Sequence, residues 1–184
     1  STPLYSSAAS DVYKRQHYLN IPTTRSLAVV KTGEEVIREN KINNKFPFLV
    51  MSYSKKNVVR GLHLQTKISQ GKFVSVVKGK IYDVAVDLRA NSKTFGKYFG
   101  CILSEANSTS IFIPPGFAHG FLTQSDSASV NYKLTNYYDP NDQNTLMWDD
   151  KTISIDWPKI KNMSISEKDS QGISFQELKE IINK

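Results

Sequence analysis

The feature that most constrains this chain is a succession of short β-rich runs, separated by turn residues, from Phe46 to Trp157. Runs rich in Val, Ile, Tyr and Phe, bounded at short spacing by Gly, Pro, Asn and Asp, are typical of antiparallel sandwiches and barrels. The candidate strands are, in order, FLVMSY, RGLHLQ, KFVSVVK, KIYDVAVDL, KYFGCIL, STSIFIP, HGFLTQ and SVNYKLTNYY. We therefore expect an all-β fold of antiparallel strands.

Two of these runs adjoin in KFVSVVKGKIYDVAVDL, where they meet at Lys78-Gly79. Because glycine reaches positive φ without steric cost, the sequence predicts a hairpin at this junction. Successive side chains point to opposite faces of a strand. In the second run, one face therefore carries Tyr82, Val84, Val86 and Leu88, and the other carries Ile81, Asp83, Ala85 and Asp87.

The C-terminal segment SFQELKEIINK has a helical pattern, with Ser174 as its N-cap. Its apolar residues at helical spacing are Phe175, Leu178, Ile181 and Ile182. TGEEVIREN, residues 32 to 40, also has helical character. A chain of 184 residues has the length of one domain. We expect that domain to span residues 46 to 184, with the C-terminal helix packed on the barrel.

Residues 1 to 45 are predicted to lie outside this domain. The first sixteen, STPLYSSAASDVYKRQ, lack any periodic pattern and resemble translated adaptor sequence. Residues 17 to 43, chiefly IPTTRSLAVVKTGEEVIREN, resemble a fragment of the selenoprotein-O family of kinase-like AMPylases. That family has a different fold, and none of its nucleotide-binding residues follows, so this resemblance implies no activity. We interpret the segment as a foreign extension joined near residues 43 to 45, with an ordinary divergent extension as the alternative.

The charge of the chain does not point to nucleic acid. The formal net charge is +7, but residues 1 to 59 hold nine Lys or Arg against four Asp or Glu, whereas residues 60 to 158 hold ten against nine. The excess therefore lies mostly in the N-terminal third, and the nearly balanced centre has no basic run and no recognised binding motif, so we expect no nucleic-acid partner. We also expect no membrane partner, because no run reaches about 18 apolar residues and no signal-peptide core is visible. The single Cys101 fits a cytoplasmic protein.

The three histidines, His17, His63 and His119, limit any metal hypothesis. A metal-binding cupin barrel offers a His-x-His pair, a nearby carboxylate and a later histidine. Here Gln65 stands in place of the second histidine, and the following residues TKISQGKFVSVV contain no acid. A catalytic metal normally takes about three protein ligands. We therefore expect no metal, and the alternative, a metal-dependent oxygenase, predicts a bound transition metal.

Acid–base chemistry fits these residues better. His63 is the candidate base, because imidazole titrates near neutral pH. Lys72 shares strand parity with Val74 and can place a cation beside a developing oxyanion. Tyr132 shares parity with Val130, so its hydroxyl is expected to point into the interior as an acid. The alternatives are a packed histidine, a solvated lysine at a strand end and a tyrosine that only fills the barrel.

A set of ordered motifs is similar to one known family. The motifs that follow the order and spacing of the dTDP-4-dehydrorhamnose 3,5-epimerase family are RGLHLQ, QGKFVSVVKGKIYDVAVDLR, SKTFGKYFGCILSEAN, IFIPPGFAHGFL, VNYKLTNYYDP, MWDD, ISIDWP and SEKD. The resemblance covers residues 50 to 170, about two thirds of the chain. It implies a metal-free cupin-type jelly roll that works without a cofactor as a homodimer. Its substrate would be the nucleotide sugar dTDP-4-keto-6-deoxy-D-glucose, inverted at C3 and C5 on the route to dTDP-L-rhamnose.

The resemblance also implies roles for individual residues. His63 would remove protons from the carbons beside the C4 ketone. Asp169 would orient the His63 imidazole and favour its charged form. Lys72 would stabilise the enolate oxygen, and Tyr132 would return a proton from the opposite face. Arg60 suits an anionic diphosphate. The full set implied in substrate binding is Arg60, His119, Asp83, Tyr138 and Gln143.

The chain departs from the family pattern mainly on its N-terminal side. A first strand of the pattern D-x-R-G-x-F-x-E is absent, VMSYS stands where Gln-x-Asn is frequent, and Gln143 stands where an acid is common. The missing strand puts nucleotide affinity and dimerisation in question. The alternatives are a single-centre epimerase or ketoisomerase acting on another 4-keto sugar nucleotide, and an inactive truncated sugar-binding cupin.

Overall fold

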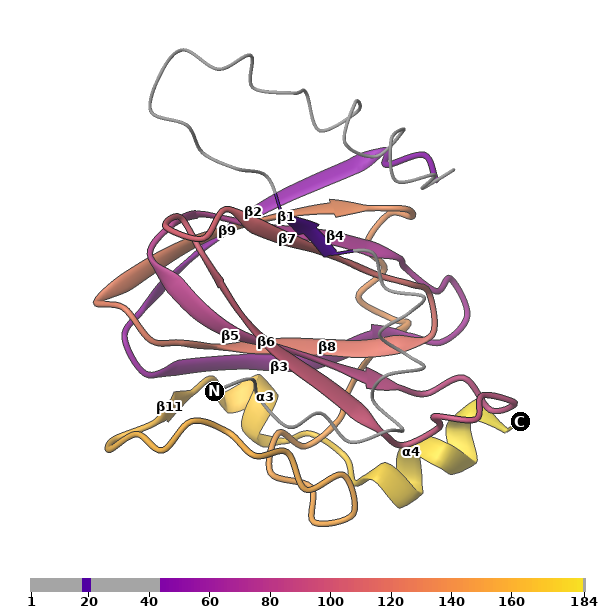
Figure 1. Ribbon diagram of the computed structural model, residues 1–184. Coiled ribbons are helices and arrows are strands. Elements are labelled where there is room, and N and C mark those ends of the chain that lie inside the picture. Colours follow the sequence, from indigo (N-terminus) through magenta and orange to yellow (C-terminus); the bar gives the residue numbers. More distant parts are fainter. Residues whose placement is uncertain (1–17, 21–43, 184) are drawn as a thin grey trace.

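Two facing β-sheets form a jelly roll in the computed structural model, which describes residues 18–20 and 44–183 (Figure 1). The strands are β1 Tyr18–Asn20, β2 Phe48–Lys55, β3 Val58–Gln65, β4 Lys72–Lys78, β5 Lys80–Asp87, β6 Tyr98–Ser104, β7 Thr109–Ile113, β8 Phe117–Thr123, β9 Ser127–Leu134, β10 Gln143–Thr145 and β11 Ser164–Ile165. The helices are α3 Glu167–Ser170 and α4 Phe175–Ile182. The predicted cupin-type barrel with a C-terminal helix is confirmed.

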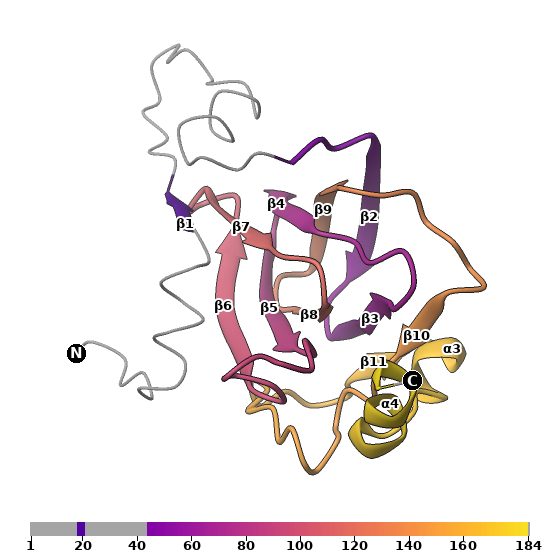
Figure 2. The same cartoon turned by 90° about the vertical axis from the view of Figure 1, so that its right-hand side faces the viewer.

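The chain passes back and forth between the two sheets. One sheet has the strand order β1-β7-β4-β9-β2, and the other has the order β10-β3-β8-β5-β6. These neighbours are antiparallel, whereas β11 runs parallel to β3. Because β2, β4, β7 and β9 alternate along the sequence with strands of the second sheet, strands that are distant in sequence face one another across the two sheets (Figure 2).

The predicted hairpin at Lys78-Gly79 is wrong. β4 pairs with β7 and β9, whereas β5 pairs with β6 and β8, so the chain leaves one sheet for the other at Gly79. Gly79 has a φ of +81°, and the carbonyl oxygen of Ser127 occupies the position that a Cβ would take. The sequence correctly predicts a turn at Gly79. Which strands pair, however, depends on tertiary packing and cannot be inferred from two runs that are adjacent in the sequence.

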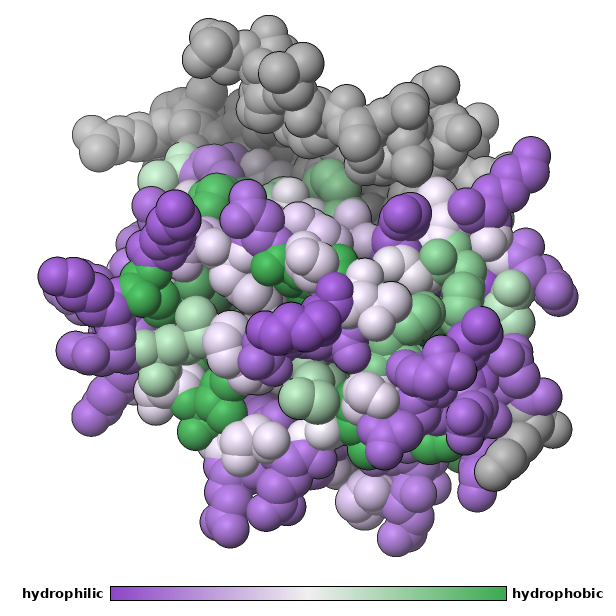
Figure 3. All heavy atoms as spheres, turned by 90° about the horizontal axis from the view of Figure 1, so that it is seen from below, coloured by the Kyte–Doolittle hydropathy of each residue, from purple (hydrophilic) through white to green (hydrophobic). Residues whose placement is uncertain are grey.

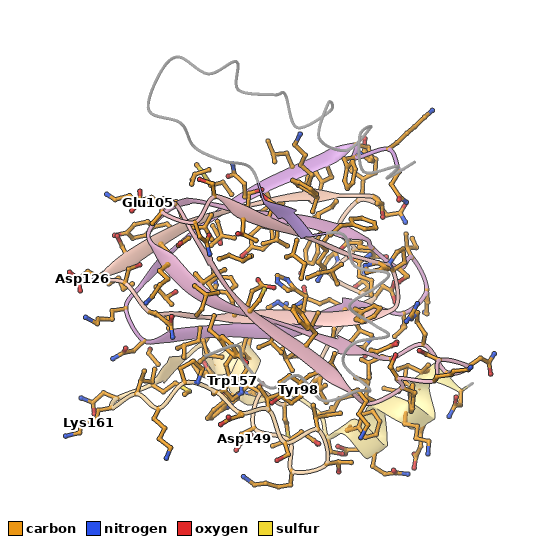
Figure 4. The ribbon with its side chains drawn as sticks, viewed as in Figure 1. Tyr98, Glu105, Asp126, Asp149, Trp157 and Lys161 are labelled. Atoms are coloured by element: carbon orange, nitrogen blue, oxygen red, sulfur yellow. The ribbon has the colours of Figure 1, made fainter. Side chains whose placement is uncertain are left out.

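The second sheet is buried on both faces, which gives the domain two apolar clusters. The inner cluster, between the sheets, includes Ile81 and Ala85 of β5. The outer cluster, beneath the second sheet, includes Val84 and Val86 of the same strand. Side chains from the C-terminal segment cover this outer face, among them Trp157, which lies below β6 in Figure 4. The predicted division of β5 into two faces therefore separates two cores rather than a core from solvent.

Helix α4 closes the outer cluster. Ser174 is its N-cap, and the side chains of Ser174 and Glu177 form a reciprocal capping box with the backbone of the first turn. Phe175 and Leu178 are buried, whereas Ile181 remains 39% exposed. The predicted helix, its N-cap and its packing on the barrel are confirmed. Below the second sheet, the surface around this region is mostly hydrophilic, with scattered apolar side chains (Figure 3).

The run SVNYKLTNYY was expected to be strand throughout, but β9 ends at Leu134 and the residues after it form a loop. Of the segment assigned to residues 1 to 45, the structure describes residues 18–20 and 44–45, and the former pair with β7 as β1. The helix predicted at residues 32 to 40 lies outside the described residues. Among the described residues, no helix is long and apolar enough to span a bilayer.

Candidate active site

A cavity of about 470 Å³ lies between the two sheets, within the size range of small-molecule sites. Its walls come from both sheets and from α3. The lining residues are Phe48, Val50, Ser52, Arg60, His63, Leu64, Gln65, Gln70, Lys72, His119, Gly120, Phe121, Tyr132, Leu134, Tyr138, Gln143, Ser166, Lys168 and Asp169. Eight of the nine residues predicted for the site line this one cavity, and the ninth, Asp83, contacts one of them.

An irregularity in β3 brings His63 to the cavity. The β3–β8 register shifts between Arg60 and His63, where Gly61 adopts a φ of +105°. A Cβ on Gly61 would lie 2.6 Å from the carbonyl oxygen of His119 and 2.7 Å from the Cα of Gly120. Glycine at this position therefore permits the close approach of two strands, and each strand presents a histidine at the point where they pair.

His63 is paired with Asp169. Its Nε2 lies 2.6 Å from Oδ1 of Asp169, whose other carboxylate oxygen accepts a hydrogen bond from the Gly61 backbone N–H at 3.1 Å. A carboxylate accepts only, so Nε2 is the donor and Nδ1 carries the free lone pair. Burial opposes ionisation of Asp169, but the hydrogen bonds from His63 and Gly61 outweigh it and hold the carboxyl pKa below its usual range.

Asp169 reaches this position through α3. Ser166 caps the short helix by accepting a hydrogen bond from the Asp169 backbone N–H, and β11 before it pairs with the start of β3. The parallel pairing places the helix beside the strand that carries His63. Asp169 is 5% exposed, whereas its neighbour Lys168 faces solvent. Only the SEKD motif, carried over by resemblance, pointed to this carboxylate from the sequence.

Lys72 lies at the start of β4 and lines the cavity beside His63. Its side chain is buried, and its Nζ donates a hydrogen bond of 3.0 Å to the His63 carbonyl oxygen. Burial lowers the pKa of Lys72 to about 8, and the nearby Asp83 carboxylate acts in the opposite direction. An ammonium group has three donors, so Lys72 retains hydrogens that can stabilise a developing negative charge.

Tyr132 lies on the opposite wall from His63, because β9 belongs to the first sheet and β3 to the second. Its hydroxyl oxygen lies 3.0 Å from Oγ of Ser52, and its ring lies 5.9 Å from that of His119. Burial raises the pKa of Tyr132 above its usual range, although the Ser52 hydrogen bond acts in the opposite direction. The phenol is therefore neutral at physiological pH, as an acid must be.

A second histidine–aspartate pair lies deeper in the barrel. Nε2 of His119 is 2.8 Å from Oδ2 of Asp83, and both side chains are almost fully buried. Burial lowers the pKa of His119, against the opposing effect of Asp83, so the imidazole is neutral near pH 7. Asp83 was predicted to bind substrate, but it does not appear among the cavity residues and instead supports His119 from behind.

Exposed lining residues mark the mouth of the cavity. Arg60 from β3, Tyr138 from the loop after β9 and Lys168 from α3 are all exposed, and Gln143 of β10 is half-buried. The Lys168 Nζ lies 3.5 Å from the Tyr138 hydroxyl, so the loop and the helix approach each other at this edge. Arg60 and Lys168 together give the mouth a positive charge.

Two glutamines that the sequence analysis did not assign to the site fix the loop that carries Tyr138. Gln65 donates to the Tyr137 carbonyl oxygen at 3.3 Å and accepts from the Asp139 N–H at 2.9 Å. Gln70 donates to the carbonyl oxygens of Asn136 and Tyr137, both at 3.0 Å. Gln65, which replaces a metal-binding histidine in the cupin comparison, thus has a structural function. Within the described residues, no three His, Cys, Asp or Glu side chains converge as a metal site would require.

The sequence model of the dTDP-4-dehydrorhamnose 3,5-epimerase family matches residues 23 to 177. The chain belongs to this family. It is therefore an enzyme of the isomerase class, as the eight motifs predicted. The match begins inside the segment assigned above to a foreign extension, whose residues 21–43 the structure does not describe, so the domain division at residue 45 stays a prediction.

Individual members of the family agree with this assignment. The enzyme of Methanothermobacter thermautotrophicus is 48% identical over 139 residues, covering 74% of this chain and 75% of that protein. The enzyme of Escherichia coli is 47% identical over 128 residues, or 69% of each chain. Among solved structures, the Legionella pneumophila epimerase in complex with dTDP-4-keto-L-rhamnose has a TM-score of 0.78 at 38% identity, covering 82% of this chain and 80% of that one. The Bacillus anthracis enzyme with TDP and pyrophosphate bound has a TM-score of 0.81 at 32% identity, with 89% and 95% covered.

Proposed function

We propose that this chain inverts C3 and C5 of dTDP-4-keto-6-deoxy-D-glucose by removing and returning protons through an enolate. One observation carries the proposal: His63, paired with Asp169, and Tyr132 lie on opposite walls of one cavity, with the cation of Lys72 beside them. Inversion at carbon requires a proton to leave from one face and return from the other. A cavity with a base on one wall and an acid on the other meets that requirement.

The first step would be proton removal at a carbon beside the ketone. The lone pair on His63 Nδ1 takes the proton, and the electron pair of the C–H bond moves through C4 to the ketone oxygen, which gives an enolate. Asp169 holds the opposite ring nitrogen and stabilises the imidazolium that forms. Lys72 stabilises the enolate oxygen, and its burial strengthens that interaction because little water screens it.

The second step would return a proton from the other wall. The Tyr132 hydroxyl protonates the carbon from the opposite face, the enolate collapses to the ketone, and the product has inverted stereochemistry. His63 then loses its proton and the Tyr132 phenolate regains one before the next cycle. Since the C4 ketone activates both neighbouring carbons, the same two groups serve C3 and C5 in turn without a cofactor.

The mouth of the cavity supports a nucleotide-linked substrate. Arg60 and Lys168 line it, and a guanidinium group can bind a diphosphate through paired hydrogen bonds. Tyr138 offers an exposed aromatic ring at the same edge, and Gln143 offers an amide. The sugar would then occupy the inner cavity, where His119 can hydrogen-bond a sugar hydroxyl through the ring nitrogen that Asp83 does not use.

We also propose that the protein works in the cytoplasm as a homodimer. The edge strand β2 turns three large apolar side chains outward, with exposed fractions of 62% for Leu49, 69% for Met51 and 63% for Tyr53. Among the described residues, β2 pairs with β9 alone, and an apolar stripe on such an edge strand can bind another chain. A second copy of this chain is the occupant that the family resemblance favours. Sedimentation equilibrium of the protein and of a Met51→Lys variant tests it, and a monomeric unaltered chain would contradict it.

The experiment that tests the activity follows deuterium entry at C3 and C5 by NMR, with dTDP-4-keto-6-deoxy-D-glucose and the full chain in heavy water. With the unaltered chain we expect deuterium exchange at both carbons and formation of the inverted product. With His63→Asn we expect neither the exchange nor the inverted product. Exchange at one carbon alone would instead indicate a single-centre epimerase. An absence of exchange with the unaltered chain would contradict the proposed function.

A further inference from the structure

Ser52 is the cavity residue whose side chain forms a hydrogen bond with the hydroxyl of the proposed acid. Its Oγ lies 3.0 Å from the Tyr132 hydroxyl oxygen. Among the described residues, this is the one hydrogen bond that the Tyr132 hydroxyl forms. Ser52 lies on the inward face of β2, between Met51 and Tyr53, which point to solvent. The other β2 side chains that line the cavity, Phe48 and Val50, are apolar. Ser52 is therefore the polar side chain among the three β2 residues that line the cavity.

The β2–β9 pairing holds the two hydroxyls in register. Val50 pairs with Tyr132, and Ser52 pairs with Val130, so Ser52 and Tyr132 are diagonal neighbours on the same inward face. Diagonal neighbours on paired antiparallel strands lie close enough for a long side chain to reach a short one. The contact therefore depends on the ladder between two strands and does not depend on a mobile loop.

We propose that Ser52 is a positioning residue that donates a hydrogen bond to the Tyr132 oxygen and so directs the phenolic hydrogen into the cavity. This inference rests on the proposed function, in which Tyr132 returns the proton. A hydroxyl can donate and accept at once, so the tyrosine oxygen accepts from Ser52 while its own hydrogen points toward the substrate. With the opposite polarity, the hydrogen would point at Ser52 and away from the reacting carbon.

The same hydrogen bond assists the transfer itself. When Tyr132 gives up its proton, a phenolate forms in a buried place where burial disfavours charge. Ser52 then donates to an anion, and such charge-assisted bonds are about twice as strong as neutral ones. Arg60 also favours the phenolate, whereas Asp83 opposes it. Ser52 thus stabilises the charge that appears during the step, at the atom where it appears.

The test compares Ser52→Ala with a matched control on the same strand. Ser54 is the next inward residue of β2, and its buried Oγ has no hydrogen-bond partner among the described residues. Ser54→Ala therefore removes the same atom from the same face without touching Tyr132. Ser52→Thr, by contrast, keeps a hydroxyl group on the Cβ of residue 52. Thermal unfolding of all three variants checks that the fold is kept.

The informative readout is the ratio of two rates measured in heavy water. His63 removes a proton and can return deuterium to the same face, which labels the substrate without inverting it. Inversion needs Tyr132. We expect Ser52→Ala to slow inversion by about 10- to 100-fold, the effect of losing a hydrogen bond to a charged group, while exchange continues at close to the normal rate. KM should change little, Ser52→Thr should recover most of the inversion rate, and Ser54→Ala should behave like the unaltered chain.

A double-mutant cycle with Tyr132→Phe makes the test sharper. If Ser52 acts through the Tyr132 hydroxyl, adding Ser52→Ala to Tyr132→Phe causes no further loss. Equal losses of exchange and inversion, a normal inversion rate in Ser52→Ala, or additive losses in the double mutant would each overturn the inference while leaving the epimerase activity in place. A complete absence of exchange in the unaltered chain would overturn the proposed function, and the inference would fall with it.

Discussion

The two histidine–aspartate pairs of this domain use the same chemical groups in different surroundings. In the pair of His63 and Asp169, the imidazole side chain is 32% exposed, and the nitrogen–oxygen distance is 2.6 Å. In the pair of His119 and Asp83, the imidazole is 5% exposed, and the distance is 2.8 Å. The His63 imidazole is therefore partly open to solvent, whereas the His119 imidazole is shielded from solvent and borders only the inner cavity.

Pairing with a carboxylate is therefore not sufficient to make a histidine a catalytic base. Both carboxylates fix the tautomer of their histidine by accepting from Nε2. Burial lowers the pKa of His119, so protonating it near pH 7 is unfavourable, and a histidine that resists protonation can bind a hydroxyl but cannot hold an abstracted proton. We therefore propose that His63 transfers protons and that His119 positions the substrate.

Replacing each histidine by asparagine should give the largest contrast. We expect His63→Asn to reduce turnover by about 10³-fold, the usual contribution of a general base, with little change in stability. His119→Asn should reduce turnover by about 10-fold, since it removes one hydrogen bond to the substrate. Steady-state kinetics and deuterium exchange measure both. Equal losses of turnover in the two variants would contradict the division of roles.

Changing the carboxylate of the first pair should have the next largest effect. Asp169 accepts from both His63 and Gly61, whereas the amide in Asp169→Asn has only one oxygen to accept with. The amide nitrogen would face His63 Nε2 and favour the other tautomer, which moves the hydrogen to the nitrogen that must act as base. We expect turnover to fall by about 10²-fold or more, with the exchange rate falling in parallel. A loss of inversion without a loss of exchange would contradict this assignment.

Removing the carboxylate of the second pair should act on stability instead. Asp83→Ala leaves His119 buried without its partner, and an unsatisfied buried polar group costs about 1–3 kcal/mol. Urea unfolding at pH 7 measures the change. Asp126→Ala is the control, because Asp126 forms an exposed ion pair with Lys56, and such pairs contribute little. Equal free energies of unfolding in the two variants would show that the buried pair is not structural.

The overall fold could be predicted from the sequence because most strands are long enough to show alternation. The elements that were missed are short: β1, β10, β11 and α3 have two to four residues, too few for any periodic pattern. The loop after β9 was mistaken for strand because its tyrosines favour β structure, yet Tyr137 and Tyr138 lie there exposed. The pairing of strands could not be predicted from the sequence either, because β4 and β5 are adjacent in sequence at Gly79 but belong to different sheets.

The site was predictable where parity and motif agreed. Lys72 and Tyr132 share strand faces with buried valines, and both line the cavity. Ser52 was missed because alternation in β2 is inverted: Met51 and Tyr53 point outward and the serine points inward. An apolar-inside rule assigns such a strand to the wrong face when its inner side borders a polar cavity. Asp83 was assigned to the cavity wall by resemblance to the family, but its carboxylate lies behind His119 and binds that residue instead.

The smallest expected effect is a change in the pH dependence of turnover, caused by the effect of Asp83 on Lys72. Lys72 must be protonated to stabilise an enolate, and with a pKa of about 8 it loses its proton as the pH rises through that value. Turnover should therefore fall on the alkaline side of about pH 8. Asp83 raises the pKa of Lys72, so its charge sustains the cation. In Asp83→Asn that support is lost, and the alkaline limb should move to lower pH while His63 remains intact. Turnover measured against pH in both proteins tests this link. If turnover decreases over the same alkaline pH range in both, the Asp83 charge does not support the Lys72 cation and the prediction is wrong.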